Sequence, residues 1–126
     1  SYLSLPEVAI NASDYFVIPV TPHEDVVSSA LCVIDEIFDV VKPNHPKIQF
    51  IGFFFNIVDD RKSAINRKNF SKIKSEAPQH VFKSYIHSDR QVEYAVSKAK
   101  TIFQVAPNSK SALDYMEVTK ELLKRI

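Results

Sequence analysis

An apolar run near the middle of the chain constrains the fold more than any other feature. Residues 48–58 read IQFIGFFFNIV and are mostly β-branched or aromatic. Such a run is typical of a strand that is buried on both faces, as in the middle of a parallel sheet. Gly52, the only glycine in the chain, lies inside this run. We therefore expect that a side chain at this position would obstruct a packed neighbour.

A polar residue, Asn56, follows at the point where this strand should end. Ligands of open α/β sheets bind just beyond the carboxyl ends of the strands. The Asn56 carboxamide can donate and accept hydrogen bonds, which makes it a candidate contact to the edge of a nucleotide base. The alternative is that Asn56 caps its own turn and has a structural role only.

Composition indicates one ordinary globular domain. The chain has 126 residues, which is enough for a single domain over residues 1–126 with a substantial core. The formal net charge of +1 favours no class of partner, and the single cysteine, Cys32, excludes an internal disulfide and a cysteine-based zinc site. No apolar run approaches the ~20 residues of a membrane span, and no secretory signal pattern opens the chain. We expect a cytoplasmic protein.

Strand and helix patterns alternate along the chain. We predict a short helix within residues 1–13, a strand over 15–21, a helix over 26–41, the central strand, a helix over 63–75, a shorter strand over 81–86 and a helix over 91–100. Thr21 and Glu24 fit a capping box at the start of the helix over 26–41, and Pro43 and Pro46 should end it. The last helix should begin after Asn108 or Ser109. Its predicted buried stripe consists of Ala112, Leu113, Met116, Val118, Leu122 and Leu123.

This alternation predicts an α/β fold, with a parallel sheet between two layers of covering helices. The helix over 63–75 is strongly basic. Arg67 with Lys74, and Lys68 with Lys72, lie one or two helical turns apart. Such a face can neutralise nucleic-acid phosphates without reading sequence. The alternative is a solvated surface without a ligand.

Sequence motifs for catalysis are absent. The chain contains no GxxxxGK[ST] phosphate-binding loop, no GxSxG, no HExxH and no pair of cysteines. Its four histidines are scattered along the sequence. From the residues alone we predict no catalytic residue and no metal ligand.

Several motifs occur in an order that resembles a known family. The segment before the first strand and the end of that strand carry Ala12, Asp14, Ile18 and Pro19. Gly52 and Asn56 mark the central strand. The last helix carries Ser109, Lys110, Ala112, Tyr115, Val118, Glu121 and Leu122. Over the whole chain this pattern resembles the carboxyl-terminal half of ParA-type ATPases, the ParA/Soj/MinD group of deviant Walker A proteins that partition plasmids and chromosomes.

Two positions depart from the family pattern. The proline after the third strand is His87 here, and the glycine of the "G-K-x-V" turn is Ala99. Both positions lie near the place where the family holds the nucleotide base.

The resemblance implies a P-loop NTPase-like fold and a role within a larger ATPase. The deviant Walker A loop and the catalytic aspartates of the family precede the position of Ser1. The intact protein is therefore expected to bind ATP and Mg²⁺, whereas this chain alone should hold neither tightly. The resemblance also implies a homodimer in the intact protein, nonspecific binding to DNA, and a ParB-like partner that stimulates ATP hydrolysis.

The resemblance also suggests roles for individual residues. Asn56 is expected to contact the adenine edge, and Ser88 and Asp89 should flank the base. Pro22 and His23 are expected in a loop that faces the partner or the second protomer. The predicted contacts to DNA are Arg67, Lys68, Lys72, Lys74, Lys98 and Lys100.

A second interpretation comes from another class of protein. The chain would then be a non-catalytic α/β interaction module that lacks the nucleotide loop, and Asn56 would be structural. A membrane-associated MinD-like relative is less favoured, because the terminal residues KELLKRI are short for an amphipathic anchor.

Overall fold

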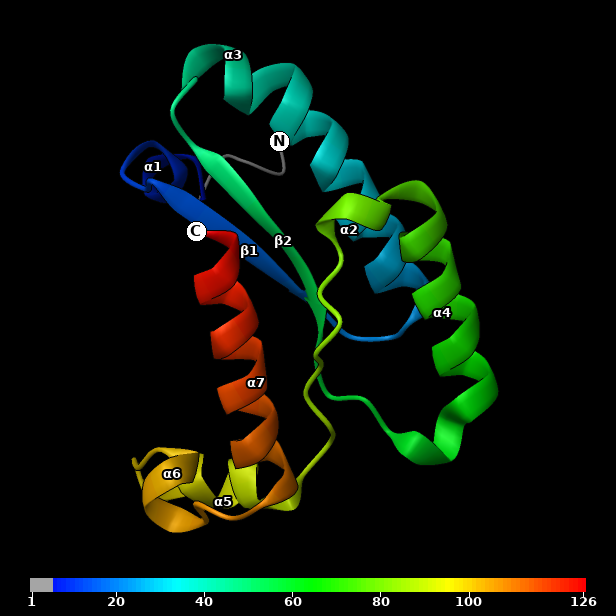
Figure 1. The fold of residues 1–126 in the computed structure, drawn as a ribbon, viewed down its shortest axis with the longest axis vertical. Helices are drawn as coiled ribbons and strands as arrows, with labels where there is room; N and C mark the ends of the chain where they lie inside the picture. Colours follow the sequence, from blue (N-terminus) through cyan, green and yellow to red (C-terminus); the bar gives the residue numbers. More distant parts are fainter. Residues whose placement is uncertain (1–5) are drawn as a thin grey trace.

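Two parallel strands form the centre of the molecule (Figure 1). The structure is a computed structural model that describes residues 6–126. Strand β1 (Tyr15–Val20) follows helix α1 (Pro6–Asn11) and pairs in parallel with strand β2 (Gln49–Phe55). Helix α2 (Glu24–Glu36), a π-helical turn (Ile37–Val41) and helix α3 (Lys42–Asn44) connect the two strands.

The chain after β2 is mostly helical. A 3₁₀ turn (Asp60–Lys62) leads into helix α4 (Ser63–Glu76), and a second 3₁₀ turn (Pro78–His80) follows it. An extended segment, residues 81–88, returns beside β2. Helices α5 (Arg90–Ser97), α6 (Ile102–Val105) and α7 (Lys110–Arg125) complete the described chain.

Helices cover both faces of the sheet, as predicted. Helices α2 and α4 lie on one side of the two strands and α7 on the other (Figure 1). Phe53, Phe55 and Ile73 belong to the core beneath α2 and α4. Ile51, Phe82 and Val118 belong to the core beneath α7. The three layers confirm the α/β architecture that the alternating pattern predicted.

Gly52 forms an irregularity in β2. The register between the strands shifts at this point, because Phe16 is opposite Phe50 whereas Val17 is opposite Gly52. The extra residue breaks the strict alternation of side chains, so Phe50 and Phe53 lie on the same face with their ring centroids 5.1 Å apart. Gly52 has a φ of +139°, and a β-carbon added there would lie 2.4 Å from the carbonyl oxygen of His80. The predicted close approach of a neighbour is confirmed.

The predicted third strand, residues 81–86, is only partly formed. The segment runs parallel to β2, and the N–H groups of Phe82 and Ile86 donate to the carbonyls of Phe53 and Phe55 at 2.8 and 2.9 Å. Between these bonds the backbone turns away from β2. The N–H groups of Lys83 and Ser84 instead donate to the carboxylate of Glu121 at 2.8 and 2.9 Å. Helix α7 therefore supplies acceptors where a regular strand would use a neighbouring strand.

The carboxylate of Glu121 joins α7 to this segment. Burial by itself raises the pKa of Glu121, but hydrogen bonds from the N–H groups of Ser84 and Lys83 and from Arg125 outweigh it, and the net shift is downward. A lowered pKa means that the link stabilises the fold above the ordinary glutamate pKa and is lost as the pH falls through the folded-state value.

Some of the expected helix boundaries were wrong. Helix α2 has His23 rather than Thr21 at its N-cap, and no side chain caps it. Pro43 does not end the helical stretch, which continues to Asn44; a proline is tolerated at the start of α3 because the first turn of a helix leaves N–H groups unpaired. The short helix α6 was not expected. Ser109, one of the two residues predicted to precede the last helix, caps α7.

Ala99 lies just after α5 in a left-handed conformation. Its φ is +53°. The N–H of Lys100 donates to the carbonyl of Ala95 at 3.0 Å, and the N–H of Ala99 donates to that of Val96 at 3.0 Å. This is the Schellman pattern, in which glycine is favoured because it has no β-carbon. The geometry explains physically why a glycine suits this position and shows that the alanine here is strained.

Candidate functional site

The carboxyl ends of β2 and of the extended segment meet at one end of the sheet. The N–H of Val58 donates to the carbonyl of Ile86, and the N–H of Ser88 donates to that of Val58, both at 2.9 Å. Because these bonds keep the two chains in parallel register, residues that follow each of them are brought to a common surface. Asn56, Ser88 and Asp89, which are far apart in sequence, all lie at this end.

The Asn56 side chain does cap its own turn. Its Oδ1 accepts a hydrogen bond from the N–H of Ile57 at 3.0 Å. Ile57 has a φ of +55°, which is rare for a β-branched residue, and its side chain is 57% exposed. Strained residues of this kind cluster at ligand sites. The Oδ1 of Asn56 thus has the structural role of a turn cap. Its Nδ2 has no partner among the described residues.

Asp89 has a structural connection that the sequence did not reveal. It is the N-cap of α5, where Oδ1 accepts from the N–H of Gln91 at 2.9 Å. Its Oδ2 accepts from the hydroxyl of Ser111 at 2.8 Å, which joins α5 to the start of α7. The Gln91 hydrogen bond, with those from Ser111, lowers the pKa of Asp89. Both oxygens are thus used inside the protein.

The three predicted base-site residues line a single pocket. It has a volume of about 150 Å³, and its lining comprises Asn56, Ile57, Ile86, His87, Ser88, Asp89, Val92, Glu93 and Tyr115. Ile57, Ile86, Val92 and Tyr115, which come from four segments of the chain, line the same space as the carboxamide. This mixture of apolar walls and a few polar groups is typical of small-molecule sites. We call it the base pocket, after the role predicted for Asn56, Ser88 and Asp89.

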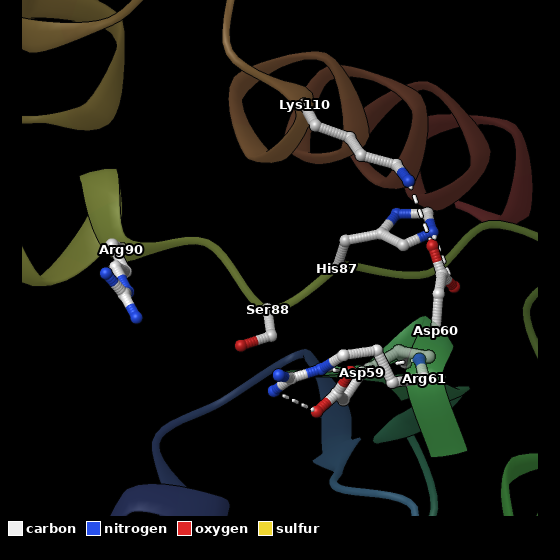
Figure 2. Close-up of a pocket in the computed structure, with 8 residues that line it drawn as sticks. Asp59, Asp60, Arg61, His87, Ser88, Arg90 and Lys110 are labelled. Atoms are coloured by element: carbon white, nitrogen blue, oxygen red, sulfur yellow. Dashed lines mark hydrogen bonds and ion pairs between the residues drawn. The ribbon is translucent and has the colours of Figure 1, made fainter. Parts of the chain in front are cut away.

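A second, more polar pocket lies beside Ser88 and His87 (Figure 2). Its volume is about 370 Å³, and it is lined by Val58, Asp59, Asp60, Arg61, His87, Ser88, Arg90 and Lys110. The Asp59 carboxylate binds Arg61 at 2.9 Å, and the side-chain hydrogen bond from Arg61 lowers the pKa of Asp59 to about 2. We call it the charged pocket.

An ion-pair network closes one side of the charged pocket. Figure 2 shows Lys110 reaching from α7 towards Asp60, with His87 beside them. Lys110 Nζ lies 3.0 Å from Asp60, and His87 Nε2 lies 3.3 Å from the same carboxylate. His87 Nδ1 lies 2.8 Å from Asp114. The Lys110 hydrogen bond lowers the pKa of Asp60 and raises that of Lys110. His87 therefore ties the extended segment to α7 and to the loop after β2.

Sequence reasoning missed several residues of the charged pocket. Asp60, Arg61, Arg90 and Lys110 come from three separate regions of the chain. The available signal was the cluster Asp59-Asp60-Arg61, which directly follows the central strand. Arg90 and Lys110 had no such signal, since only the fold brings the first turns of α5 and α7 to this end.

The predicted DNA-contacting residues do not form one surface. Arg67, Lys68, Lys72 and Lys74 are exposed on α4 and form no ion pair within the described residues. Arg67 and Lys74 line a groove with Tyr85, whereas Lys72 faces α2 and lies 3.4 Å from the Ser28 hydroxyl. Lys98 and Lys100 follow α5, which lies far from α4 across the molecule (Figure 1).

Pro22 and His23 line a further pocket of about 510 Å³ at the carboxyl end of β1. Ile57, Asp59 and Lys62 also line this pocket. The loop predicted to face a partner or the second protomer is thus adjacent to the loop that carries Asn56. Within residues 6–126 no group of three His, Cys, Asp or Glu side chains could hold a metal ion. None of the described helices is long and apolar enough to cross a membrane.

Two relatives of known sequence match most of this chain. No family model matches the sequence. An uncharacterized protein of Methanocaldococcus jannaschii is 24% identical over 116 residues, covering 91% of this chain and 44% of the relative. The virulence plasmid ParA family protein pGP5-D of Chlamydia psittaci is 29% identical over 118 residues, covering 94% of this chain and 44% of the relative. The chain thus spans less than half the length of these relatives.

Solved structures give the same result for the fold. Apo McdA of Cyanothece superposes with a TM-score of 0.75 and 16% identity, covering 90% of this chain and 46% of McdA. MinD of Aquifex aeolicus superposes with a TM-score of 0.75 and 12% identity, covering 96% of this chain and 48% of MinD. The fold is that of the carboxyl-terminal half of the ParA/MinD ATPases. The chain is similar in sequence and fold to this portion of such ATPases, as the motif order indicated.

Proposed function

We propose that the chain acts as part of a ParA-like ATPase and holds the base of the nucleotide. The observation that carries this proposal is the base pocket, where Asn56 and Ser88 from separate segments meet apolar walls at the carboxyl end of the strands. A Cyanothece McdA variant of the same fold has been solved in complex with ATP, which supports a nucleotide as the ligand. Residues outside this chain would hold the phosphates and Mg²⁺.

The residues present fit a base better than they fit phosphate or metal. The Asn56 Nδ2 group has no partner among residues 6–126 and can donate to a base, and Ile57, Ile86 and Val92 supply apolar contacts to a planar ring. None of the described residues that line the base pocket is a lysine or an arginine that could neutralise a phosphate. The chain can therefore position a nucleoside, and ATP hydrolysis belongs to the intact ATPase. In that protein we further propose ATP-dependent homodimerisation, action in plasmid or chromosome partitioning, and a ParB-like partner that binds near Pro22 and His23.

Nucleoside binding tests this proposal. Titration of the ¹⁵N-labelled chain with adenosine should shift the amide signals of Ser88 and Val92, with a dissociation constant in the millimolar range. Asn56→Ala removes the amide donor, which is worth about 1 kcal/mol, and should weaken binding about fivefold. Asn108→Ala, in an exposed turn outside the pocket, serves as the control. Absence of adenosine binding, with both variants folded, would instead favour the non-catalytic interaction module.

We also propose that α4 contacts DNA without sequence specificity. Its four basic side chains are exposed and form no ion pair among the described residues, so their charges are available to phosphates. Lys98 and Lys100 would then contribute a separate contact beyond α5. The charged pocket is a second candidate surface for DNA, because Arg61 and Arg90 line it. The guanidinium of Arg90 forms no ion pair within residues 6–126.

Charge reversal distinguishes α4 from the rest of the surface. We expect the pair Arg67→Glu and Lys68→Glu to weaken binding of a random DNA duplex at least tenfold at low salt, measured by fluorescence anisotropy. The pair Lys47→Glu and Lys124→Glu changes the net charge equally at exposed positions away from α4 and should have a smaller effect. The slope of log affinity against log salt should fall only for the α4 pair. Equal effects of the two pairs would contradict a specific role for α4.

A further inference from the structure

Most polar groups around the base pocket are already used within the protein. Both Asp89 oxygens accept internal hydrogen bonds, and the Asn56 Oδ1 accepts from Ile57. The N–H groups of His87 and Ser88 donate to Asp114 and to the carbonyl of Val58, and the His87 ring contacts two carboxylates. These contacts leave few side-chain groups whose hydrogen bonds could discriminate between one base and another.

Among the side chains of described residues that line the pocket, one amide donor, one carboxylate and two hydroxyls remain. The donor is the Asn56 Nδ2, and the hydroxyls are those of Ser88 and Tyr115, each of which can serve in either role. The acceptor is the carboxylate of Glu93, which lies in the first turn of α5 and lines the pocket. Glu93 forms no ion pair and no side-chain hydrogen bond among the described residues, and an ionised carboxylate can only accept.

We infer that Glu93 is a specificity-determining residue that selects a 6-aminopurine over a 6-oxopurine; this inference rests on the proposed function of the base pocket. An exocyclic amino group donates a hydrogen bond and satisfies the carboxylate. A 6-oxo group presents an acceptor to an acceptor, which is repulsive and leaves both oxygens without a donor. The Asn56 Nδ2 donor would complement this choice at N1, which accepts a hydrogen bond in adenine but carries a proton in a 6-oxopurine. Ile57, Val92 and the ring of Tyr115 hold the base plane without contributing to the choice.

Adenosine and inosine provide the test, because they differ at the C6 substituent and the protonation of N1. We expect adenosine to bind the ¹⁵N-labelled chain about fivefold to tenfold more tightly than inosine, as for a charged hydrogen bond at a partly solvated site. Glu93→Gln replaces one acceptor oxygen by a donor, so it should bring the adenosine-to-inosine ratio near one. Glu76→Gln removes the same charge at the end of α4, outside the pocket, and should keep the wild-type ratio.

The outcomes separate this inference from the proposed function. Equal binding of the two nucleosides by the wild-type chain would overturn the role of Glu93 while base binding stands. An adenosine-to-inosine affinity ratio that is the same in Glu93→Gln as in the wild type would also overturn the role of Glu93, because another group would then discriminate between the two bases. Absence of binding by either nucleoside would overturn both the inference and the proposed function.

Discussion

Gly52→Ala is expected to destabilise the protein by about 4 kcal/mol. The new β-carbon would lie 2.4 Å from the His80 carbonyl oxygen and 3.2 Å from Arg125 Nη1. The first contact involves backbone, which cannot move away without disturbing the turn before the extended segment. The φ of +139° is in addition a conformation that only glycine adopts readily, and such strain and overpacking each cost roughly 1–3 kcal/mol.

Thermal or urea unfolding monitored by circular dichroism measures this effect. A loss of about 4 kcal/mol should lower the midpoint of thermal unfolding by more than about 10 °C for a chain of this size. Ala99→Gly is the matched control, since it removes a β-carbon from an exposed residue with a φ of +53°. That change should stabilise the protein by about 1 kcal/mol. A Gly52→Ala protein with unchanged stability would show that the β2 irregularity is not as tight as described.

Arg125→Ala is expected to cost about 3 kcal/mol of stability. The guanidinium donates to the carbonyls of Ile51, Gln79 and Val81, the last at 2.9 Å. It also pairs with Glu121 at 3.0 Å and lies 4.5 Å from the centre of the Phe82 ring. One side chain of α7 thus satisfies backbone groups of β2 and of the chain around the start of the extended segment. Hydrogen bonds from a charged donor contribute about 1.5–3 kcal/mol each and do not add fully.

Urea unfolding of Arg125→Ala, Arg125→Lys and Lys124→Ala separates packing from charge. The lysine variant should recover only part of the loss, because a single ammonium cannot span the three carbonyls. Lys124 is exposed, so its replacement should change stability by less than about 0.5 kcal/mol. The difference between Arg125→Ala and wild type should narrow at low pH, where Glu121 becomes protonated and the ion pair is lost. A loss for Arg125→Ala no larger than that for Lys124→Ala would contradict this anchoring role.

The sequence predicted the layers of the fold well because burial leaves a periodic pattern. The apolar run around Phe53 and the helical spacing of α2 each identified an element without knowledge of its neighbours. The predicted stripe of α7 was less accurate. Ala112 and Val118 are buried, but Leu113, Met116 and Leu123 are 57%, 47% and 64% exposed within the described fold. Helical spacing alone does not say which apolar side of a helix meets the sheet.

The predicted third strand was inaccurate for a different physical reason. Residues 81–86 have strand-like composition, yet Lys83 and Ser84 bond to a carboxylate that lies 37 residues or more further along the chain. No local sequence pattern indicates that the Glu121 carboxylate accepts these hydrogen bonds. Asp89 is a similar case, since its bond to Ser111 depends on how α5 and α7 meet.

The sequence by itself determined the order of the two strands and of helices α2, α4, α5 and α7, the need for glycine at position 52 and the position of Asn56 at a strand end. Each of these follows from local burial, backbone freedom or turn chemistry. Only the tertiary structure decided which polar groups remain available at that end. It joined Asn56, Ser88 and Glu93 in one pocket, used both oxygens of Asp89 internally, and separated Lys98 and Lys100 from α4. Hydrogen bonds between segments that are distant in sequence determine which polar groups remain available. Spacing along the sequence does not predict such bonds.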